Sequence, residues 1–318
     1  MRAAMRFFRD FSARPGPHPT IVIGAFDGLH RGHLALLRAA ATSGGPWAML
    51  CFEPLPKEYF LGAKSPNTEW PPRLTTAVER LRLMADGTLP APDTVWQLRF
   101  NHALAALEAE AFVATILVSA LGVRQVIVGE DFRFGRGRIG DVALLATLGR
   151  RHGFTVEAVP MVLENGIRIS SSRVRATLAA GDLDGARRLL GRPFDYTGRV
   201  SRGLGMGRRL GFATANFSLH RRRLPLAGIF AVRVRPAGGG PWYDGVASAG
   251  VRPTLGDGGQ PLLEVHLFDY DGDLYGRRLT VRFIARLRDE QRFDDLEAMT
   301  RQMALDAAAA RAALAACQ

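Results

Sequence analysis

The sequence predicts two domains: a doubly wound α/β arrangement, then a small antiparallel β-barrel with a terminal helix. Short β-rich runs alternate with helical patterns from Thr20 to about Pro160, and extended runs without intervening helices follow Pro193. The 318 residues are 47% hydrophobic, which is enough for two cores. We expect an N-terminal domain over residues 1–176, a helical connector over 177–193 and a C-terminal domain over 194–318.

Strand and helix alternate through the N-terminal domain. The apolar runs TIVIGAF, WAMLCF, QVIVG and FTVEAVP are typical of buried strands. The stretches LALLRAAA, EAFVATILVSALG and DVALLATLGRRHG are typical of helices, as is the leucine-spaced stretch after Arg73. Such alternation requires crossover connections and therefore a parallel sheet, whose ligands bind at the carboxyl ends of the strands.

The connector and the C-terminal domain follow a different pattern. Two short helices are expected in SRVRATLAAG and DLDGARRLLG, because each ends in a glycine suited to a left-handed cap. The extended runs DYTGRVSRG, GIFAVRVRP, YDGVASAGVRP, LLEVHLFDY and RRLTVRFIARL are typical of a small antiparallel barrel, with a turn signal at Asp271-Gly272. Asp294 and Asp295 are expected to cap a last helix through the alanine-rich tail.

The composition favours small phosphate-bearing ligands over nucleic acid or membrane. The 42 basic and 30 acidic residues give a net charge of +12, but they are spread along the chain without a basic stripe, and only Lys57 and Lys64 are lysines. Cys51 and Cys317 offer neither a disulfide framework nor a metal-ligand spacing, and no apolar run is long enough to span a bilayer. We expect a cytoplasmic protein without nucleic-acid or membrane partners, and a transient homo-oligomer stays open.

The segment GAFDGLHRGH lies where the first predicted strand ends and the first helix begins. Backbone N–H groups at a helix N-terminus bind anions, and the glycines let a phosphate approach. His30 and His33, three residues apart, share a helix face and can donate hydrogen bonds to charge developing on a phosphate. Two alternatives are a metal pair, for which the chain shows no second pair at ligand spacing, and histidines on a solvated helix.

Two motifs resemble those of the nucleotidylyltransferase superfamily. GAFDGLHRGH resembles the signature GxFDGxHxGH, and ISSSRVR, from Ile169 to Arg175, resembles the second motif ISSTxxR. The resemblance implies nucleotidyl transfer from a nucleoside triphosphate with His30 and His33 as catalytic residues. It implies ATP and phosphate contacts at Gly24, Phe26, Asp27, Gly28, Gly32, Ser171, Ser172, Arg173 and Arg175. The two arginines are expected to clamp the triphosphate, with a capped, exposed helix start as the alternative.

FEPLPKEYF and GEDFRFGRGRIGD resemble further segments of the prokaryotic FAD synthetase family. They imply a flavin site at the carboxyl end of the sheet, with Asp131 as a polar contact. Phe132 or Phe134 would then line the flavin pocket. The alternative is structural, because aromatic residues at a spacing of two are common in protein cores.

A second set of residues points to phosphate chemistry in the C-terminal domain. GRVSRGLGMGRRLGFATANF joins a glycine-rich loop to Thr214 and Asn216, whose oxygen atoms are ligands that Mg²⁺ accepts. An ordinary barrel loop is the alternative. The segment resembles the signature GxxxGRxLGFPTAN of riboflavin kinases, which implies Mg²⁺ at Thr214 and Asn216. The implied phosphate contacts are Gly203, Gly205, Gly207, Arg208 and Gly211.

The rest of the C-terminal domain resembles the same family in GVRPT, LEVHLFDYDGDLYG and LRDEQRFDDLEAM. The resemblance makes Glu264 the catalytic base, which accepts the proton of the ribityl hydroxyl as that hydroxyl attacks the γ-phosphate of ATP. Arg288 and Phe293 are expected to contact the flavin. Without the resemblance, Glu264 would be taken as an outward residue in a surface ion pair.

The resemblance spans roughly Ile21 to Arg311, in the domain order of bacterial bifunctional riboflavin kinase/FAD synthetases. It implies ATP-dependent phosphorylation of riboflavin to FMN, then adenylyl transfer from ATP to FMN, giving FAD and pyrophosphate. Four positions depart from the family pattern: Ala25 for asparagine, Leu34 for glutamine, Ala213 for proline and Ser248 for asparagine. They leave two alternatives open, a divergent paralogue with one active domain and a non-catalytic flavin- or ATP-binding regulatory protein.

Overall fold

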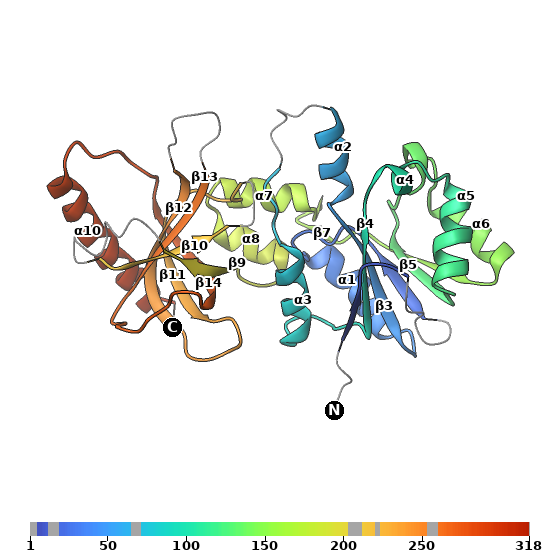
Figure 1. The fold of residues 1–318 in the computed structure, drawn as a ribbon, viewed down its shortest axis with the longest axis horizontal. Helices are drawn as coiled ribbons and strands as arrows, with labels where there is room; N and C mark the ends of the chain where they lie inside the picture. The colour runs from blue at the N-terminus through green and yellow to red at the C-terminus, as the bar shows by residue number, and fades with distance from the viewer. Residues whose placement is uncertain are drawn as a thin grey trace. The chain divides into compact units, whose positions relative to one another are not determined.

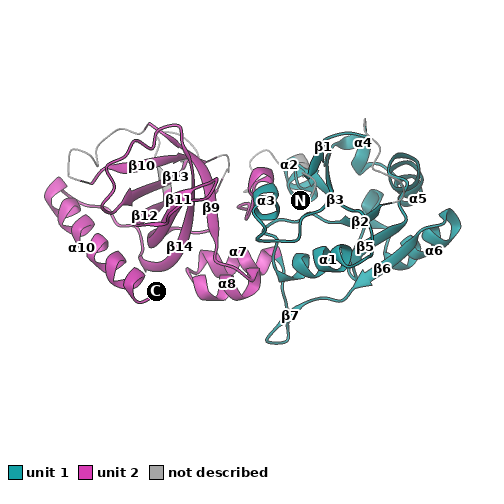
Figure 2. Ribbon diagram, turned by 90° about the horizontal axis from the view of Figure 1, so that it is seen from below, with its two compact units in different colours: residues 1–70, 80–170 teal, residues 71–79, 171–318 magenta. Residues whose placement is uncertain are grey.

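The computed structural model describes residues 5–11, 19–64, 71–202, 212–219, 223–252 and 260–317. The chain divides into two compact units (Figure 2). Unit 1 comprises Met1–Trp70 and Arg80–Ser170, and unit 2 comprises Pro71–Glu79 and Ser171–Gln318. The helices expected as a connector therefore group with the barrel, together with a short segment that the sequence analysis did not separate.

Unit 1 contains a six-stranded parallel sheet in the order β1-β4-β3-β2-β5-β6 (Figure 1). Its strands are β1 Arg6–Phe8, β2 Thr20–Ile23, β3 Trp47–Glu53, β4 Thr94–Arg99, β5 Gln125–Gly129 and β6 Thr155–Val159. The residues of β2 are all buried, as are the first six of β3, which is the pattern of a sheet covered on both faces. The predicted doubly wound α/β fold is confirmed.

Helices pack on both faces of this sheet. The helices between β2 and β6 are α1 Arg31–Ala41, α2 Pro56–Lys64, α3 Ala77–Ala85, α4 His102–Ala105, α5 Ala109–Phe112, the π-helix η1 Val113–Ala120, the 3₁₀-helix η2 Arg136–Arg138 and α6 Val142–His152. Leu37 of α1 and Met84 belong to the core on one face, and Leu117 of η1 and Leu145 of α6 belong to the core on the other. The chain moves outward from β2 through β3 to β4 and then returns to β5 on the other side. In doubly wound sheets, ligands bind at such a reversal, which lies here at the carboxyl end of β2.

Several elements of unit 1 were not expected from the sequence. Strands β1 and β4 were missed, and α2 occupies a segment that was expected to form a loop. A hairpin of β7 Leu163–Glu164 and β8 Ile167–Arg168 precedes the second motif, with Asn165 and Gly166 at positive φ in its turn.

Unit 2 is a closed antiparallel barrel in the order β10-β13-β12-β11-β14-β9, which confirms the predicted architecture. Its elements are α7 Ser171–Ala179, α8 Leu183–Leu190, β9 Asp195–Ser201, β10 Thr214–Ser218, β11 Gly228–Pro236, β12 Tyr243–Arg252, β13 Gln260–Leu267, β14 Arg278–Arg288 and α10 Leu296–Ala315. Gly191 ends α8 in the left-handed conformation, and Asp295 caps α10 by accepting the Ala298 N–H at 2.6 Å. Helix α10 covers the barrel by packing Ala310 and Leu314 against Ala231.

Candidate active sites

The first motif connects β2 to α1 and places His30 as the N-cap of the helix. His30 Nδ1 accepts the backbone N–H of His33 at 3.4 Å. Because Nδ1 is the acceptor, the neutral imidazole carries its proton on Nε2. His30 therefore lies just outside the helix, and its Nε2–H is a donor suited to a phosphate oxygen.

The two histidines of the motif lie together. Their rings stack with centroids 3.8 Å apart and an interplanar angle of 16°. The Phe26 ring lies 5.3 Å from that of His33 and is fully buried. Phe26 was expected to contact ATP, but the structure places its side chain in the core behind His33, so only its backbone is left for a phosphate. Asp27 and Gly28 of the same turn are also buried.

The turn before α1 holds an unusual backbone. Phe26, Gly28 and Leu29 have positive φ values of 51°, 84° and 45°. Two of these are not glycine, and such strain is concentrated at functional sites in proteins. A Cβ on Gly32 would lie 3.2 Å from His30 Nδ1 and 3.8 Å from the carbonyl oxygen of Ile169, so the start of the second motif approaches the first motif inside unit 1.

The second motif opens helix α7 in unit 2. The Arg175 Nε donates to the carbonyl of Pro72 at 2.7 Å, which fixes the base of its guanidinium. Ser171 and Arg173 are partly buried, whereas Ser172 is exposed. Residues two positions apart project from different sides of a helix. The clamp of Arg173 and Arg175 on the triphosphate stays a prediction, with the two side chains on different sides of α7.

An aromatic cluster lies at the carboxyl ends of β3 and β4. Phe52 of β3 and Tyr59 and Phe60 of α2 surround Phe100, with ring centroids 5.7, 5.3 and 5.7 Å from it. The Phe60 side chain is 43% exposed, so the cluster presents an apolar surface to a ligand. The segment FEPLPKEYF contains three of these rings. Phe100 lies far along the chain in no recognised motif, so the sequence did not indicate that it belongs to the cluster.

The residues after β5 that were expected to contact the flavin form contacts within the protein. Asp131 is exposed and forms an ion pair with Arg168 of the β7–β8 hairpin. The Phe132 ring stacks on Phe134 at 5.6 Å and 14°, against the core that includes Phe112. Phe134 is buried and therefore fits the alternative that these aromatic residues are part of the core. Phe132 is only half-buried and fits that alternative less well.

Three strands of the barrel bring the expected kinase residues into one row. Asn216 of β10 pairs with Glu264 of β13, which pairs in turn with Ser248 of β12, and Thr214 pairs with His266. Their neighbours Ala215, Val265 and Ala247 are the buried interior residues, so the row faces outward. Glu264 is partly buried between Asn216 and Ser248, which differs from an isolated surface carboxylate.

Asn216 and Thr214 fit a magnesium ion. Asn216 is 7% exposed, and its buried Oδ1 has no hydrogen-bond donor among the described residues. A buried acceptor without a donor is costly unless a ligand meets it, and an amide oxygen is a hard ligand for Mg²⁺. The glycine-rich phosphate contacts, Gly203, Gly205, Gly207, Arg208 and Gly211, lie outside the described residues.

Glu290 is a further carboxylate beside this row that the sequence analysis did not single out. Ser248 Oγ donates to Glu290 Oε1 at 3.3 Å, and the Glu290 carboxylate lies where a side chain on Gly250 would be. Burial raises the pKa of Glu290, against the opposing effects of the Ser248 hydrogen bond and the Arg288 charge. Ser248 and Glu290 are 42 residues apart, so no local pattern joins them.

Arg288 of β14 forms an ion pair with the last helix. Its Nε and Nη2 donate to both carboxylate oxygens of Asp306 on α10 at 2.8 and 2.6 Å, and it lies 5.9 Å from the Phe293 ring. Its guanidinium joins α10 to β14, and the expected flavin contact by Arg288 stays a prediction.

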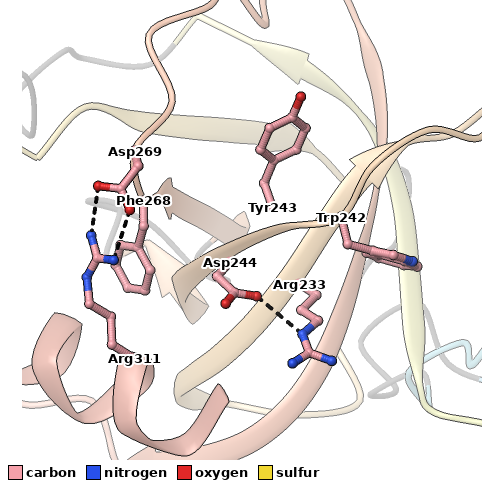
Figure 3. Close-up of a pocket in the computed structure, with 7 residues that line it drawn as sticks. All are labelled: Arg233, Trp242, Tyr243, Asp244, Phe268, Asp269 and Arg311. Atoms are coloured by element: carbon pink, nitrogen blue, oxygen red, sulfur yellow. Dashed lines mark hydrogen bonds and ion pairs between the residues drawn. The ribbon is translucent and has the colours of Figure 1, made fainter. Parts of the chain in front are cut away.

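A separate groove lies between β11, β12 and α10 (Figure 3). It is crossed by two ion pairs, Arg233 with Asp244 at 3.2 Å and Arg311 with Asp269 at 2.9 Å. Arg311 lowers the pKa of Asp269 through a hydrogen bond and its charge. Because each arginine is already neutralised and no expected site residue lines the groove, we assign it to the attachment of α10.

Across the described parts of the chain, no cluster of three or more histidine, cysteine or acidic side chains is arranged to hold a metal ion. None of the helices in the described ranges is both long and apolar enough to cross a membrane.

Comparison with known proteins gives concordant matches. A family model for FAD synthetase matches residues 16–173, and one for riboflavin kinase matches residues 190–314. The bifunctional riboflavin kinase/FMN adenylyltransferase of Pseudomonas fluorescens is 48% identical over 294 residues, covering 91% of each chain. The protein of that name from Escherichia coli K12 is 42% identical over 311 residues and 96% of each chain. A crystal structure of a macrolide-efflux protein from Streptococcus pneumoniae superposes with a TM-score of 0.78 at 28% identity, covering 95% of this chain and 97% of that one.

Proposed function

Because the chain belongs to the family of bacterial bifunctional riboflavin kinase/FMN adenylyltransferases, we propose how its own residues divide the two reactions. The enzyme phosphorylates riboflavin to FMN with one ATP and transfers AMP from a second ATP to FMN, which yields FAD and pyrophosphate. The observation that carries the residue-level proposal is the stacked pair of His30 and His33, 3.8 Å apart at the carboxyl end of β2. We also propose a cytosolic location and small-molecule partners only.

The histidine pair acts on the α-phosphate during adenylyl transfer. The FMN phosphate attacks the α-phosphorus as pyrophosphate leaves, and the protein contributes positioning and hydrogen bonds to the developing charge. His30 donates through Nε2, and His33 lies in the first turn of α1, next to the helix N-terminus that attracts anions. The family resemblance adds Ser171, Ser172, Arg173 and Arg175 as ligands of the remaining phosphates.

The aromatic cluster of Phe52, Tyr59, Phe60 and Phe100 binds the isoalloxazine ring of FMN. Its place at the carboxyl ends of β3 and β4 supports this assignment, since ligands of doubly wound sheets bind there. Partly exposed rings offer a stacking surface to a flat heterocycle. Phe132, which packs on the same side of the sheet, is proposed as the opposite wall of this pocket.

Glu264 acts as the general base of the kinase. Its carboxylate accepts the proton of the ribityl terminal hydroxyl as the oxygen attacks the γ-phosphorus and ADP leaves. Thr214 and Asn216 would hold Mg²⁺ beside it, in register on the neighbouring strand. A magnesium ion held there offsets charge on the ATP phosphates.

The proposal is tested by incubating purified protein with riboflavin, excess ATP and Mg²⁺, and following FMN and FAD by chromatography, with parallel runs from FMN. Glu264→Gln should abolish FMN formation and leave FAD formation from FMN unchanged, and His30→Ala should do the reverse. Each variant is the folding control for the other. FMN without FAD in the unmodified protein, even from added FMN, would mean that Ala25 and Leu34 mark a failed adenylyl site. The absence of both products would favour a binding protein.

A further inference from the structure

His266 contacts the backbone immediately before the proposed magnesium ligands. It lies on β13 two residues after Glu264 and pairs in register with Thr214 of β10. Its Nδ1 is 2.9 Å from the carbonyl oxygen of Ala213. A carbonyl only accepts, so Nδ1 carries the proton and donates this bond.

The imidazole is held in place by two phenyl rings. Phe212 meets it edge-on at 5.3 Å and 70°, and Phe268 does so at 5.8 Å and 72°. Both phenyl rings therefore restrain the imidazole, and the bond it donates is directed at one backbone carbonyl. A polar side chain with such restraint loses little conformational entropy in making the bond.

The backbone at Ala213 lacks a restraint that proline would provide. The riboflavin kinase signature has proline where this sequence has Ala213, so the residue before Thr214 lacks the fixed φ angle that proline provides. Alanine has a wider range of backbone angles, and any movement here is passed directly to Thr214 and, two residues on, to Asn216. A hydrogen bond to the Ala213 carbonyl limits this movement from outside the strand.

We propose that His266 is a positioning residue of the kinase, which fixes the entry of β10 and thereby the oxygen ligands of Thr214 and Asn216 for Mg²⁺-nucleotide. The inference rests on the proposed role of these two residues. It predicts that the hydrogen bond, and not the aromatic packing of His266, is what the reaction requires.

Two substitutions separate these contributions. His266→Phe keeps a ring that can contact Phe212 and Phe268 but removes the donor. His266→Asn removes the ring but keeps an amide donor at the position of Nδ1. We would measure kcat and KM for riboflavin phosphorylation, the binding of ADP by calorimetry with and without Mg²⁺, and the melting temperature of each nucleotide-free protein.

His266→Phe should weaken Mg²⁺-dependent ADP binding and kcat/KM by about three- to tenfold, the effect of one lost hydrogen bond. The melting temperature, the KM for riboflavin and the rate of FAD formation from FMN should not change. His266→Asn should recover most of the loss, and Ala213→Pro introduced into His266→Phe should restore it, since proline supplies the restraint by another route.

Wild-type ADP binding by His266→Phe would overturn the inference, as would an Asn variant as impaired as the Phe variant. If the melting temperature fell in parallel with the loss of ADP binding, the inference would also be wrong, because His266 would then contribute to packing only. Failure of the proposed role of Thr214 and Asn216 would look different: ADP binding by the unmodified protein would then be independent of Mg²⁺, and Asn216→Ala would be as active as the unmodified protein.

Discussion

Substitution of Gly32 by alanine should slow adenylyl transfer without lowering the stability of the fold. Gly32 is the second residue of α1, and alanine in a helix is favoured over glycine by up to about 1 kcal/mol. The added Cβ would, however, lie 3.2 Å from His30 Cε1 and Nδ1, against ordinary carbon contacts of about 3.5–4.0 Å. Because His30 is buried and stacked on His33, the ring has little room to retreat.

The size of the effect follows from this geometry. His30 must move by roughly 0.4 Å to restore normal contact, and a displacement of about 1 Å at a reacting centre can reduce a rate by roughly a hundredfold. We therefore expect FAD formation from FMN to slow by about tenfold, or about 1.4 kcal/mol of activation free energy. The assay is the initial rate of FAD formation at saturating ATP, with FMN formation from riboflavin as the internal reference.

A matched control is Gly45→Ala, in the same unit, where the new Cβ would meet only the end of the Arg124 side chain at 3.4 Å. This variant should keep both activities. If Gly32→Ala formed FAD at the unmodified rate, the position of His30 would not matter for the chemistry, and its proposed role would have to be abandoned.

Three further outcomes are expected. Cys51 is buried, which raises the pKa of its thiol to about 11, so iodoacetamide at pH 8 should alkylate only Cys317 in the native protein and both thiols in denaturant, as counted by mass spectrometry. Glu290→Gln should raise the melting temperature at pH 8 and less so as the pH approaches about 4. The folded pKa of Glu290 lies above its unfolded value, so deprotonation disfavours the native state, and an equal gain at both pH values would contradict this. Asp306→Ala should destabilise the barrel by about 2 kcal/mol in urea titration because it strands the half-buried Arg288, whereas Asp269→Ala, at an exposed pair, should cause a clearly smaller loss.

The sequence predicted features that depend on local chemistry. The glycine-rich turn before His33 lies between a buried strand and a helix, as expected, and Asp295 caps the last helix because an acidic side chain there accepts a free N–H. The alternation of apolar runs was enough to establish a parallel sheet and then a barrel. These elements are determined by residues that are near one another in the chain.

What the sequence did not predict depends on residues brought together from a distance. Phe100 joins the aromatic cluster only because β4 lies beside β3, and β4 itself was missed because TVWQLR mixes polar with apolar residues. Glu290 reaches Ser248 across the barrel, although a local motif indicated only that the region belonged to the domain. The pairing of Arg288 with Asp306 on α10 likewise joins residues 18 positions apart, and no motif indicated it.

The assignment of Pro71–Glu79 to the barrel unit bears on how the enzyme can be cut or shuffled. Glu79 Oε1 accepts the backbone N–H of Thr197 in β9 at 2.9 Å, and the carbonyl of Pro72 accepts from Arg175. A gene fragment that begins at α7 would encode a kinase without these nine residues, and its complement would carry them with no partner. The two units are thus interleaved in the reading frame, so a cut just before α7 separates the barrel from a segment that packs with it.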